Sequence, residues 1–396
     1  MKPSIDFLKN LEMKDARGIL RYAASCMTEA DCKVISEEEI IALQEKYGLV
    51  GDYLPQVLQA RRDLEKKPDW MMWVAVASHA FSIFKPTEAT KTPMPVSDGS
   101  LATDMAPLFP LLARAEWAAE SYRKHGFSEE EVKTYLRSYA GCIATVDRRN
   151  GQPGINKSYF HWLALYACAV IFRIGGLNFN FREFADYCVI LRHNETGKRE
   201  ILLRNKVFNA AGMPIESELQ NLPEGAYSTA FAETADAFYG HPVRNYRCTK
   251  ELVAYPKTEW SIYMTQGDPV LGVHIPRGAD ISEPAARAAL TAAQNLVKER
   301  FPENPIKGLT CNSWLLDPAF DTMLKDGSKI RQFANIFERF PNKSAGGAVY
   351  SFVFDKKMPP EEWPENTSLE RALKQYYLSG HCVYFTNGFY PLDEER

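Results

Sequence analysis

Apolar positions follow a helical spacing through the first part of the chain and a spacing of two after it. The helical period predicts helices at 54–64, 70–84, 101–124, 129–146 and 157–173. Ser36 and Ser128 each precede three glutamates, which is the pattern of a helix capping box. The segment 85–100 is rich in proline, threonine and serine and predicts a surface loop. Residues 1–175 are therefore expected to form an all-helical domain.

After Gly175 and Gly176 the apolar residues alternate with polar ones. The sequence LNFNFREF predicts a half-buried strand, with its phenylalanines on one side and its asparagines on the other. The runs YCVILRH and REILLRN, joined by NETGK, predict a β-hairpin over 187–205. The fold class is therefore α+β, with the helical domain followed by a mixed α/β domain over 176–396.

One unit of this second domain is well defined. A short apolar strand at 270–275, an amphipathic helix at 281–300 and a second strand at 308–315 predict two parallel neighbours joined by a crossover helix. Ligands of such sheets collect at the carboxyl ends of the strands. Alternation places His274 at that end, on the face of Gly272, whose missing side chain leaves room for another group to approach.

Composition is typical of a soluble protein of two domains. The chain has 396 residues, of which 45% are hydrophobic and 24% charged, with a net charge of −3. Since no long run of like charges occurs, we expect neither a nucleic-acid nor a membrane partner. The longest apolar run, 160–172, is too short to span a bilayer.

Other features narrow the location and the chemistry. The N-terminal sequence has no apolar signal-peptide core, and the eight cysteines form no CxxC pair, so a cytoplasmic protein with reduced thiols is expected. Histidines and cysteines are scattered, which predicts no metal site. The sequence contains no GxSxG, GxxxxGK[ST] or GxGxxG, so it gives no support to a hydrolase, a kinase or a dehydrogenase.

Four segments carry a resemblance to a known family. HIPRGADIS, CNSWLLDP, WPENTSLERALKQYYLSG and RIGGLNFNF resemble bacterial acyltransferase domain-containing proteins, which pair a helical N-acyltransferase N-terminal domain with a GNAT-like C-terminal domain. The resemblance extends from about residue 35 to 390. It implies a GNAT-like scaffold, with acetyl-coenzyme A or another acyl-coenzyme A (acyl-CoA) as the donor.

The resemblance also implies where the cofactor binds. In that scaffold the pantetheine arm bonds to the backbone of the first parallel strand, here Val273 and Ile275, and the pyrophosphate lies on the following loop, here Arg277, Gly278 and Ala279. Unpaired N–H groups and the helix dipole favour an anion there. RGADIS departs from the superfamily loop, because it has one glycine and an acidic residue that could itself cap the helix. A phosphate cradle and a plain packing corner therefore both remain open, and Arg277 is either a phosphate ligand or a solvated surface charge.

The candidate catalytic residues lie at the ends of the two parallel strands. Acyl transfer to an amine needs a base, because an alkylammonium with a pKa near ~10 attacks only when it is neutral. His274 is the candidate base, and the alternative is a packed histidine bonded to a carbonyl group. Asn312 and Ser313 could bind the thioester oxygen or protonate the leaving thiolate, or could bond only to the local backbone. Cys311 shares a face with leucines and is read as a buried, inert thiol.

Two functions from different classes follow. The first is an acyl-CoA-dependent N-acyltransferase acting on an amine of a small molecule or a peptide. The second is a GNAT-like protein that has lost catalysis and binds a ligand or a partner. The sequence gives neither the acceptor, nor the acyl chain length, nor the oligomeric state.

Overall fold

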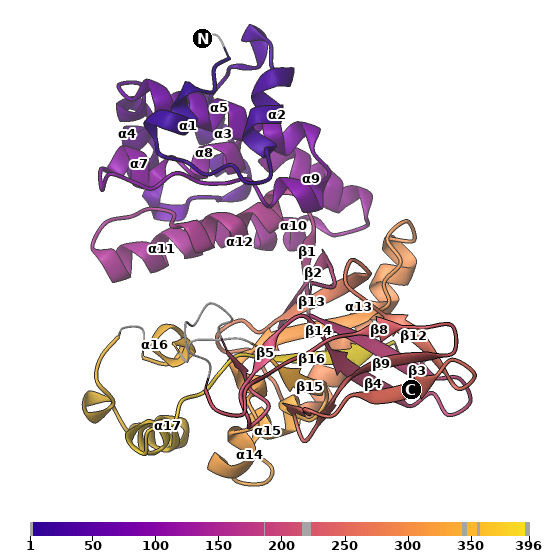
Figure 1. Cartoon of the computed structure of the whole chain (residues 1–396). Coiled ribbons are helices and arrows are strands. Elements are labelled where there is room, and N and C mark those ends of the chain that lie inside the picture. The colour runs from indigo at the N-terminus through magenta and orange to yellow at the C-terminus, as the bar shows by residue number, and fades with distance from the viewer. Residues whose placement is uncertain (1–2, 186, 216–222, 343–346, 355–356, 393–396) are drawn as a thin grey trace. The chain divides into compact units, whose positions relative to one another are not determined.

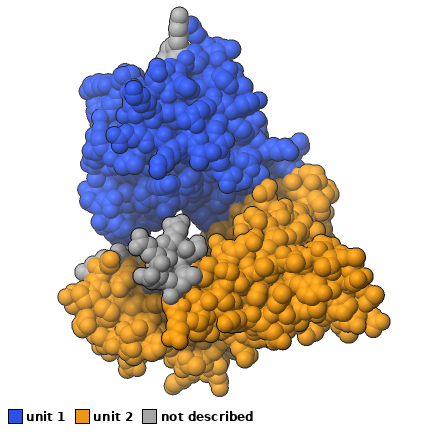
Figure 2. Space-filling view, in the orientation of Figure 1, with its two compact units in different colours: residues 1–172 blue, residues 173–396 orange. Residues whose placement is uncertain are grey.

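The computed structural model describes residues 3–185, 187–215, 223–342, 347–354 and 357–392. The chain divides into two compact units, residues 1–172 and 173–396, which Figure 2 distinguishes by colour. The first unit is built from helices, and the second is a sheet-rich domain (Figure 1). The α+β fold class expected from the sequence is confirmed.

The helices of the first unit surround α5, which contacts α1, α2, α4, α6 and α8. The helices are α1 (Asp6–Asn10), α2 (Ile19–Cys26), α3 (Glu37–Tyr47), α4 (Leu54–Leu64), α5 (Pro68–Ile83), α6 (Pro86–Ala89), α7 (Leu101–Met105), α8 (Leu108–Leu112), α9 (Ala115–Lys124), α10 (Glu129–Leu136), α11 (Ser138–Asn150) and α12 (Lys157–Ala167), with 3₁₀ turns η1 (Glu29–Asp31) and η2 (Gly51–Tyr53). Both expected capping boxes are present, at Ser36 and Ser128.

Three of the expected helices are interrupted or end earlier in the structure than the apolar pattern of the sequence predicts. The helix expected at 101–124 is divided into α7, α8 and α9, and Pro107, which lacks the N–H needed to continue α7, lies at the first break. The helix expected at 129–146 is divided at Arg137. The helix expected at 157–173 ends at Ala167, because Ala169 takes a left-handed φ of 51° and the apolar residues after it form a strand.

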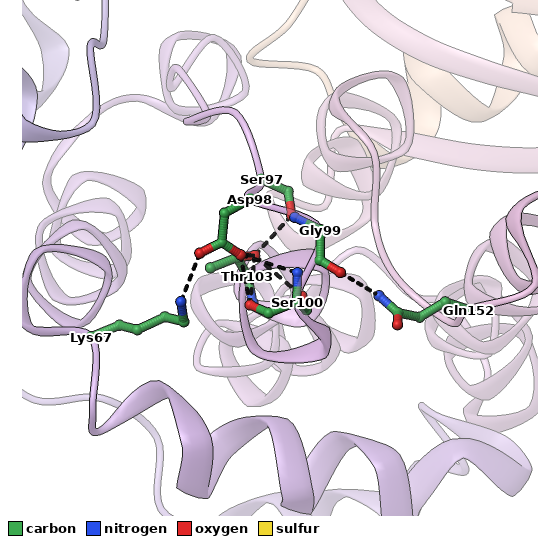
Figure 3. A network of polar contacts seen from close by, with 7 residues as sticks. All are labelled: Lys67, Ser97, Asp98, Gly99, Ser100, Thr103 and Gln152. Atoms are coloured by element: carbon green, nitrogen blue, oxygen red, sulfur yellow. Dashed lines mark hydrogen bonds and ion pairs between the residues drawn. The ribbon is translucent and has the colours of Figure 1, made fainter.

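The segment 85–100, expected to be a surface loop, is partly buried and ordered by polar contacts. It contains α6, and its Thr92 is fully buried. Figure 3 shows the network that attaches the end of this segment to α7. Asp98 Oδ1 accepts hydrogen bonds from the Ser100 N–H (3.0 Å) and from the hydroxyls of Ser100 (2.7 Å) and Thr103 (2.6 Å), while Asp98 Oδ2 pairs with Lys67 Nζ at 2.7 Å. These donors, Lys67 first, hold the pKa of Asp98 far below its ordinary value.

Asp98→Ala is expected to lower the free energy of unfolding of the helical unit by about 1–2 kcal/mol, because several charge-assisted hydrogen bonds are lost together. Since the folded-state pKa is lowered, this contribution is present above the unfolded value near 3.8 and is lost as the pH falls below it. Urea unfolding followed by far-ultraviolet circular dichroism measures the change. Asp63→Ala, which removes a surface carboxylate paired with Lys66 and Gln59, is the control and should cost clearly less than Asp98→Ala. Equal losses in the two variants would contradict a structural role for the network.

The second unit contains a mixed six-stranded sheet in the order β1-β2-β13-β14-β16-β15, a seven-stranded antiparallel sheet around β3, β4 and β9, and a small sheet of β5, β6 and β7. The strands are β1 (Ile171–Ile174), β2 (Leu177–Glu183), β3 (Cys188–His193), β4 (Arg199–Leu203), β5 (Val207–Phe208), β6 (Pro214–Ile215), β7 (Tyr227–Ser228), β8 (Ala232–Glu233), β9 (Ala237–Arg244), β10 (Arg247–Cys248), β11 (Val253–Pro256), β12 (Trp260–Met264), β13 (Pro269–His274), β14 (Gly308–Ser313), β15 (Glu338–Pro341) and β16 (Thr386–Pro391).

The helices of this unit lie outside the sheets. They are α13 (Glu283–Arg300), α14 (Phe320–Met323), α15 (Lys329–Ala334), α16 (Ala348–Phe352) and α17 (Ser368–Leu378), with 3₁₀ turns η3 (Trp314–Leu316) and η4 (Pro360–Glu362). The expected hairpin at 187–205 is present as β3 and β4. The expected strand–helix–strand unit is present as β13, α13 and β14, and its two strands are parallel.

The two larger sheets bury one shared core. Apolar residues of β3, β4 and β12 pack against Val270, Phe340 and Phe389 of the first sheet. The opposite face of the first sheet meets α13, where the ring of Phe181 lies 4.9 Å from that of Phe301. Because one face is covered by a helix and the other by a sheet, both faces of β13 are enclosed along most of its length.

The segment between β15 and β16 forms an aromatic lobe together with residues that follow β14. Its core contains Trp314, Phe354 and Trp363, and α16 and α17 lie together at one side of the unit (Figure 1). The lobe core begins at the residue after β14, and Phe385, which packs against it, directly precedes β16. An apolar cluster is thereby attached to the carboxyl end of β14 and to the beginning of β16.

Candidate functional site

The parallel strands β13 and β14 stop pairing with each other near their carboxyl ends. Their register runs from Leu271–Leu309 to Val273–Cys311. The next residues pair outward instead, His274 with Asn178 of β2 and Asn312 with Asn387 of β16. Both strands remain in the sheet through their outer neighbours, so the pairing between them ends at their carboxyl ends, where ligands of such sheets collect.

A row of polar side chains crosses this end of the sheet. Residues opposite each other in a ladder share a face, so Asn178, His274, Asn312 and Asn387 lie side by side on the face away from α13. Asn312 Nδ2 donates to Asn387 Oδ1 at 2.6 Å. Nδ2 of Asn387, which is 2% exposed, has no hydrogen-bond partner. A buried amide N–H without an acceptor is suited to donate a hydrogen bond to a carbonyl group of a ligand.

His274 is held by an asparagine from the neighbouring strand. Its Nε2 lies 2.8 Å from Oδ1 of Asn180. Asn180 is opposite Gly272 in the register, and a Cβ at Gly272 would lie 2.4 Å from that same oxygen. The room at Gly272 is therefore occupied by the Asn180 amide. Burial of the ring, with the positive charge of Arg182 nearby, lowers the pKa of His274 to about 4, so the imidazole is neutral at physiological pH.

The loop after β13 makes one tight turn before α13. Ala279 N–H donates to the Pro276 carbonyl at 3.1 Å, and Gly278 has a φ of 80°, which a glycine adopts without strain. Arg277 and Gly278 are exposed. The sequence-predicted cofactor residues thus lie on β13 and on the turn that leads to the beginning of α13.

Asp280 does not cap α13. The N-cap is Ser282, whose side chain makes no capping hydrogen bond. Asp280 accepts instead from the Ser282 N–H and pairs with Lys329 Nζ at 2.9 Å, and Lys329 is the main cause of the lowered pKa of Asp280. The helix dipole is therefore directed at an end without a side-chain cap, and the two acidic residues there, Asp280 and Glu283, are paired with Lys329 and Arg287.

The structure brings together some of the predicted catalytic residues and separates others. His274 and Asn312 share the polar face. Ser313 lies on the opposite face, where its hydroxyl accepts from the Leu315 N–H at 3.2 Å and begins η3. Cys311 is 1% exposed, and burial raises its pKa to about 12, so its thiol is not a nucleophile at neutral pH.

Sequence reasoning did not identify Asn180, Thr310 and Asn387 as site residues. Asn180 is 6% and Thr310 3% exposed, and Oγ1 of Thr310 is buried without a hydrogen-bond partner. The alternation in LNFNF placed Asn180 on a polar face, but that pattern is typical of a solvated strand. Only the ladder shows that this face is buried and directed at His274.

The described residues show neither a metal site nor a membrane-spanning helix. No group of three or more histidine, cysteine, aspartate or glutamate side chains among them could hold a metal ion. None of the helices described is both long and apolar enough to cross a bilayer.

The comparisons with known proteins agree on the fold. A family model described as "GNAT-like C-terminal domain" matches residues 171–390, whereas no curated protein matches the chain. The chain is similar to an acyltransferase mutant in complex with octanoyl-CoA and to an acyltransferase in complex with decanoyl-CoA and teicoplanin, each with a TM-score of 0.63, 18% identity and coverage of 99% of this chain and 100% of that chain. It is also similar to an acyltransferase in complex with decanoyl-CoA, with a TM-score of 0.64, 18% identity and 98% coverage of both chains. At this identity the likeness establishes the fold.

Proposed function

The chain belongs to the family with a GNAT-like C-terminal domain, and from this membership we propose that it is an acyl-CoA-dependent N-acyltransferase. The observation that carries the proposal is the end of pairing between β13 and β14 beside a neutral, partly buried histidine. The acceptor is proposed to be an amine of a small molecule or a peptide, since one similar acyltransferase was solved with teicoplanin.

The donor is proposed to lie along β13 and on the turn after it. Backbone groups of Val273 and Ile275 would bind the pantetheine arm, while Arg277, Gly278 and Ala279 would hold the pyrophosphate at the beginning of α13. The α13 end without a side-chain cap and the pairing of Asp280 with Lys329 support this placement. We propose a donor longer than acetyl, like those solved with the similar enzymes.

In the proposed reaction the amine nitrogen bonds to the thioester carbonyl carbon and the C–S bond breaks. The proton that the nitrogen loses passes to Nδ1 of His274 and then to the sulfur, so coenzyme A leaves as a thiol. Asn312 and Asn387 are proposed to contact the carbonyl oxygen, since both lie in the same row as His274. Ser313 is proposed to support the end of β14, because its hydroxyl is already bonded to the backbone.

Octanoyl- or decanoyl-CoA is expected to raise the melting temperature of the chain, since saturation at a hundredfold above Kd adds ~2.7 kcal/mol to a native state that binds it. Arg277→Ala should require about tenfold more acyl-CoA for the same rise in melting temperature, as expected for loss of one charge-assisted contact to a phosphate. Lys257→Ala, which removes an exposed partner of Glu233 in the second sheet, is the control and should leave binding unchanged. Release of the coenzyme A thiol with teicoplanin, amino sugars and peptide amines then measures turnover.

The results separate the two classes of function. Binding with turnover supports the transferase. Binding without turnover over the whole acceptor panel favours a GNAT-like binding protein instead. No thermal shift with acetyl-, octanoyl- or decanoyl-CoA would contradict both the donor and the proposed role of the α13 end.

A further inference from the structure

The orientation of the Asn180 amide is fixed from two sides. Nδ2 of Asn180 donates to the carbonyl oxygen of Phe181 at 3.3 Å. A carbonyl oxygen only accepts, so the amide nitrogen faces the backbone and the amide oxygen faces His274. Asn180 is 6% exposed, and its place is available only because Gly272 has no side chain. The contact with His274 is therefore built into three positions on two strands.

This contact selects one tautomer of the imidazole ring. A neutral imidazole carries one N–H, and Oδ1 of Asn180 can only accept. The hydrogen must then lie on Nε2, which places the lone pair on Nδ1. We propose that Asn180 is a positioning residue that holds His274 in the Nε2–H tautomer, which leaves Nδ1 as the basic nitrogen of the ring, with Gly272 present to admit the Asn180 side chain.

The inference rests on the proposed function for its catalytic part, but the tautomer can be measured without catalysis. The charged group facing the ring is Arg182, two residues along β2 from Asn180, and its positive charge opposes protonation of His274. The amide oxygen of Asn180 carries no net charge, so it does not offset the effect of Arg182 on the pKa of His274. A carboxylate in its place would favour the imidazolium and raise the pKa of His274 by about 1–3 units.

The test combines nuclear magnetic resonance of the ring nitrogens with steady-state kinetics of the full-length chain. In the wild type we expect the Nε2–H tautomer and a pKa of His274 well below its ordinary value. N180D should raise that pKa by about 1–3 units, measured by titration of the ring nitrogen resonances. N180A should lower kcat about 10- to 100-fold, the usual cost of losing a residue that orients a functional histidine, while KM for acyl-CoA stays the same. G272A should reproduce N180A, because the added methyl group displaces the Asn180 amide.

N178A is the matched control for the ring. Asn178 lies directly opposite His274 on the same face and is 7% exposed, but the 2.8 Å contact is made by Asn180. N178A should leave the tautomer and the pKa of His274 unchanged. An Nδ1–H tautomer in the wild type, or an unchanged pKa and tautomer in folded N180D and G272A, would overturn the proposal. If the ring responds as expected but no acceptor is acylated, the positioning role stands and the proposed function fails.

Discussion

Alanine in place of His274 is expected to slow acyl transfer by about 10²–10⁴-fold, the usual contribution of a general base. Binding of acyl-CoA should stay within about twofold, because the donor is proposed to be held by backbone groups and by the loop after β13. Initial rates of coenzyme A release, with the thermal shift measured on the same samples, separate the two effects. His381→Ala is the control, since that histidine is exposed and stacks on Tyr376 in the aromatic lobe. Full activity of His274→Ala on an identified acceptor would rule out this role.

The lowered pKa of His274 also sets the expected pH dependence. With a pKa of about 4, the ring does not deprotonate a free alkylammonium, and it accepts a proton only once attack on the carbonyl has made the nitrogen acidic. The rate should therefore rise with pH toward the pKa of the acceptor amine, with no break near 6.5.

The stability of the second unit should also depend on pH, because His274 takes up its proton at a higher pH in the unfolded state than in the folded state. The free energy of unfolding should fall by at most about 1.4 kcal/mol per pH unit from 6.5 toward 4, and His274→Ala should remove this slope.

Arg339 lies at the centre of a buried polar cluster at β15. Its side chain is 1% exposed, and its guanidinium donates to Asp321 Oδ2 and to Asn335 Oδ1, both at 2.8 Å. It also donates to the Leu316 carbonyl at 3.4 Å and stacks on the ring of Tyr246 at 3.9 Å. One side chain thus connects β15, α14, η3 and the turn between β9 and β10.

Arg339→Ala is expected to destabilise the second unit by about 3–5 kcal/mol, because it leaves Asp321 with only the longer contact to Arg331 (4.0 Å) and removes the partner of a backbone carbonyl. Hydrogen exchange at the amides of β15 and β16 measures the loss within that unit. Arg287→Ala is the control, since its pair with Glu283 is exposed and worth about 0.3–0.5 kcal/mol. Arg339→Met combined with Asp321→Leu should cost less than Arg339→Ala, because no charge remains buried. A loss below about 1 kcal/mol in Arg339→Ala would show that the cluster is not needed.

Local patterns predicted those parts of the fold that local physics determines. The capping boxes at Ser36 and Ser128, the β3–β4 hairpin and the parallel β13–β14 pair are each encoded in a continuous stretch and are confirmed. Helix lengths were harder to predict from the sequence, because Pro107 and the left-handed Ala169 interrupt apolar runs that otherwise continue. The strands from β5 to β12 were not predicted. Apart from the eight-residue β9, they are runs of two to five residues, which carry little periodicity.

The candidate site shows the same limit. Alternation placed His274 and Gly272 on one face, but it could not show that Asn180 fills the space at Gly272, because that contact joins residues far apart in the chain. The sequence spacing of Asp280 and Glu283 suggested a capping pair. In the structure Asp280 pairs with Lys329 and Glu283 with Arg287, and the former partner is contributed by a distant helix.

The place where the aromatic lobe joins the sheet has an evolutionary consequence. Pro341 and Thr386 face each other in the antiparallel register of β15 and β16, so the segment of the lobe between these strands leaves and re-enters the sheet at a single point, as a long hairpin loop would. The entropic cost of closing a loop rises only slowly with its length. A segment joined in this way can be lengthened, shortened or exchanged between relatives while the two strands keep their pairing.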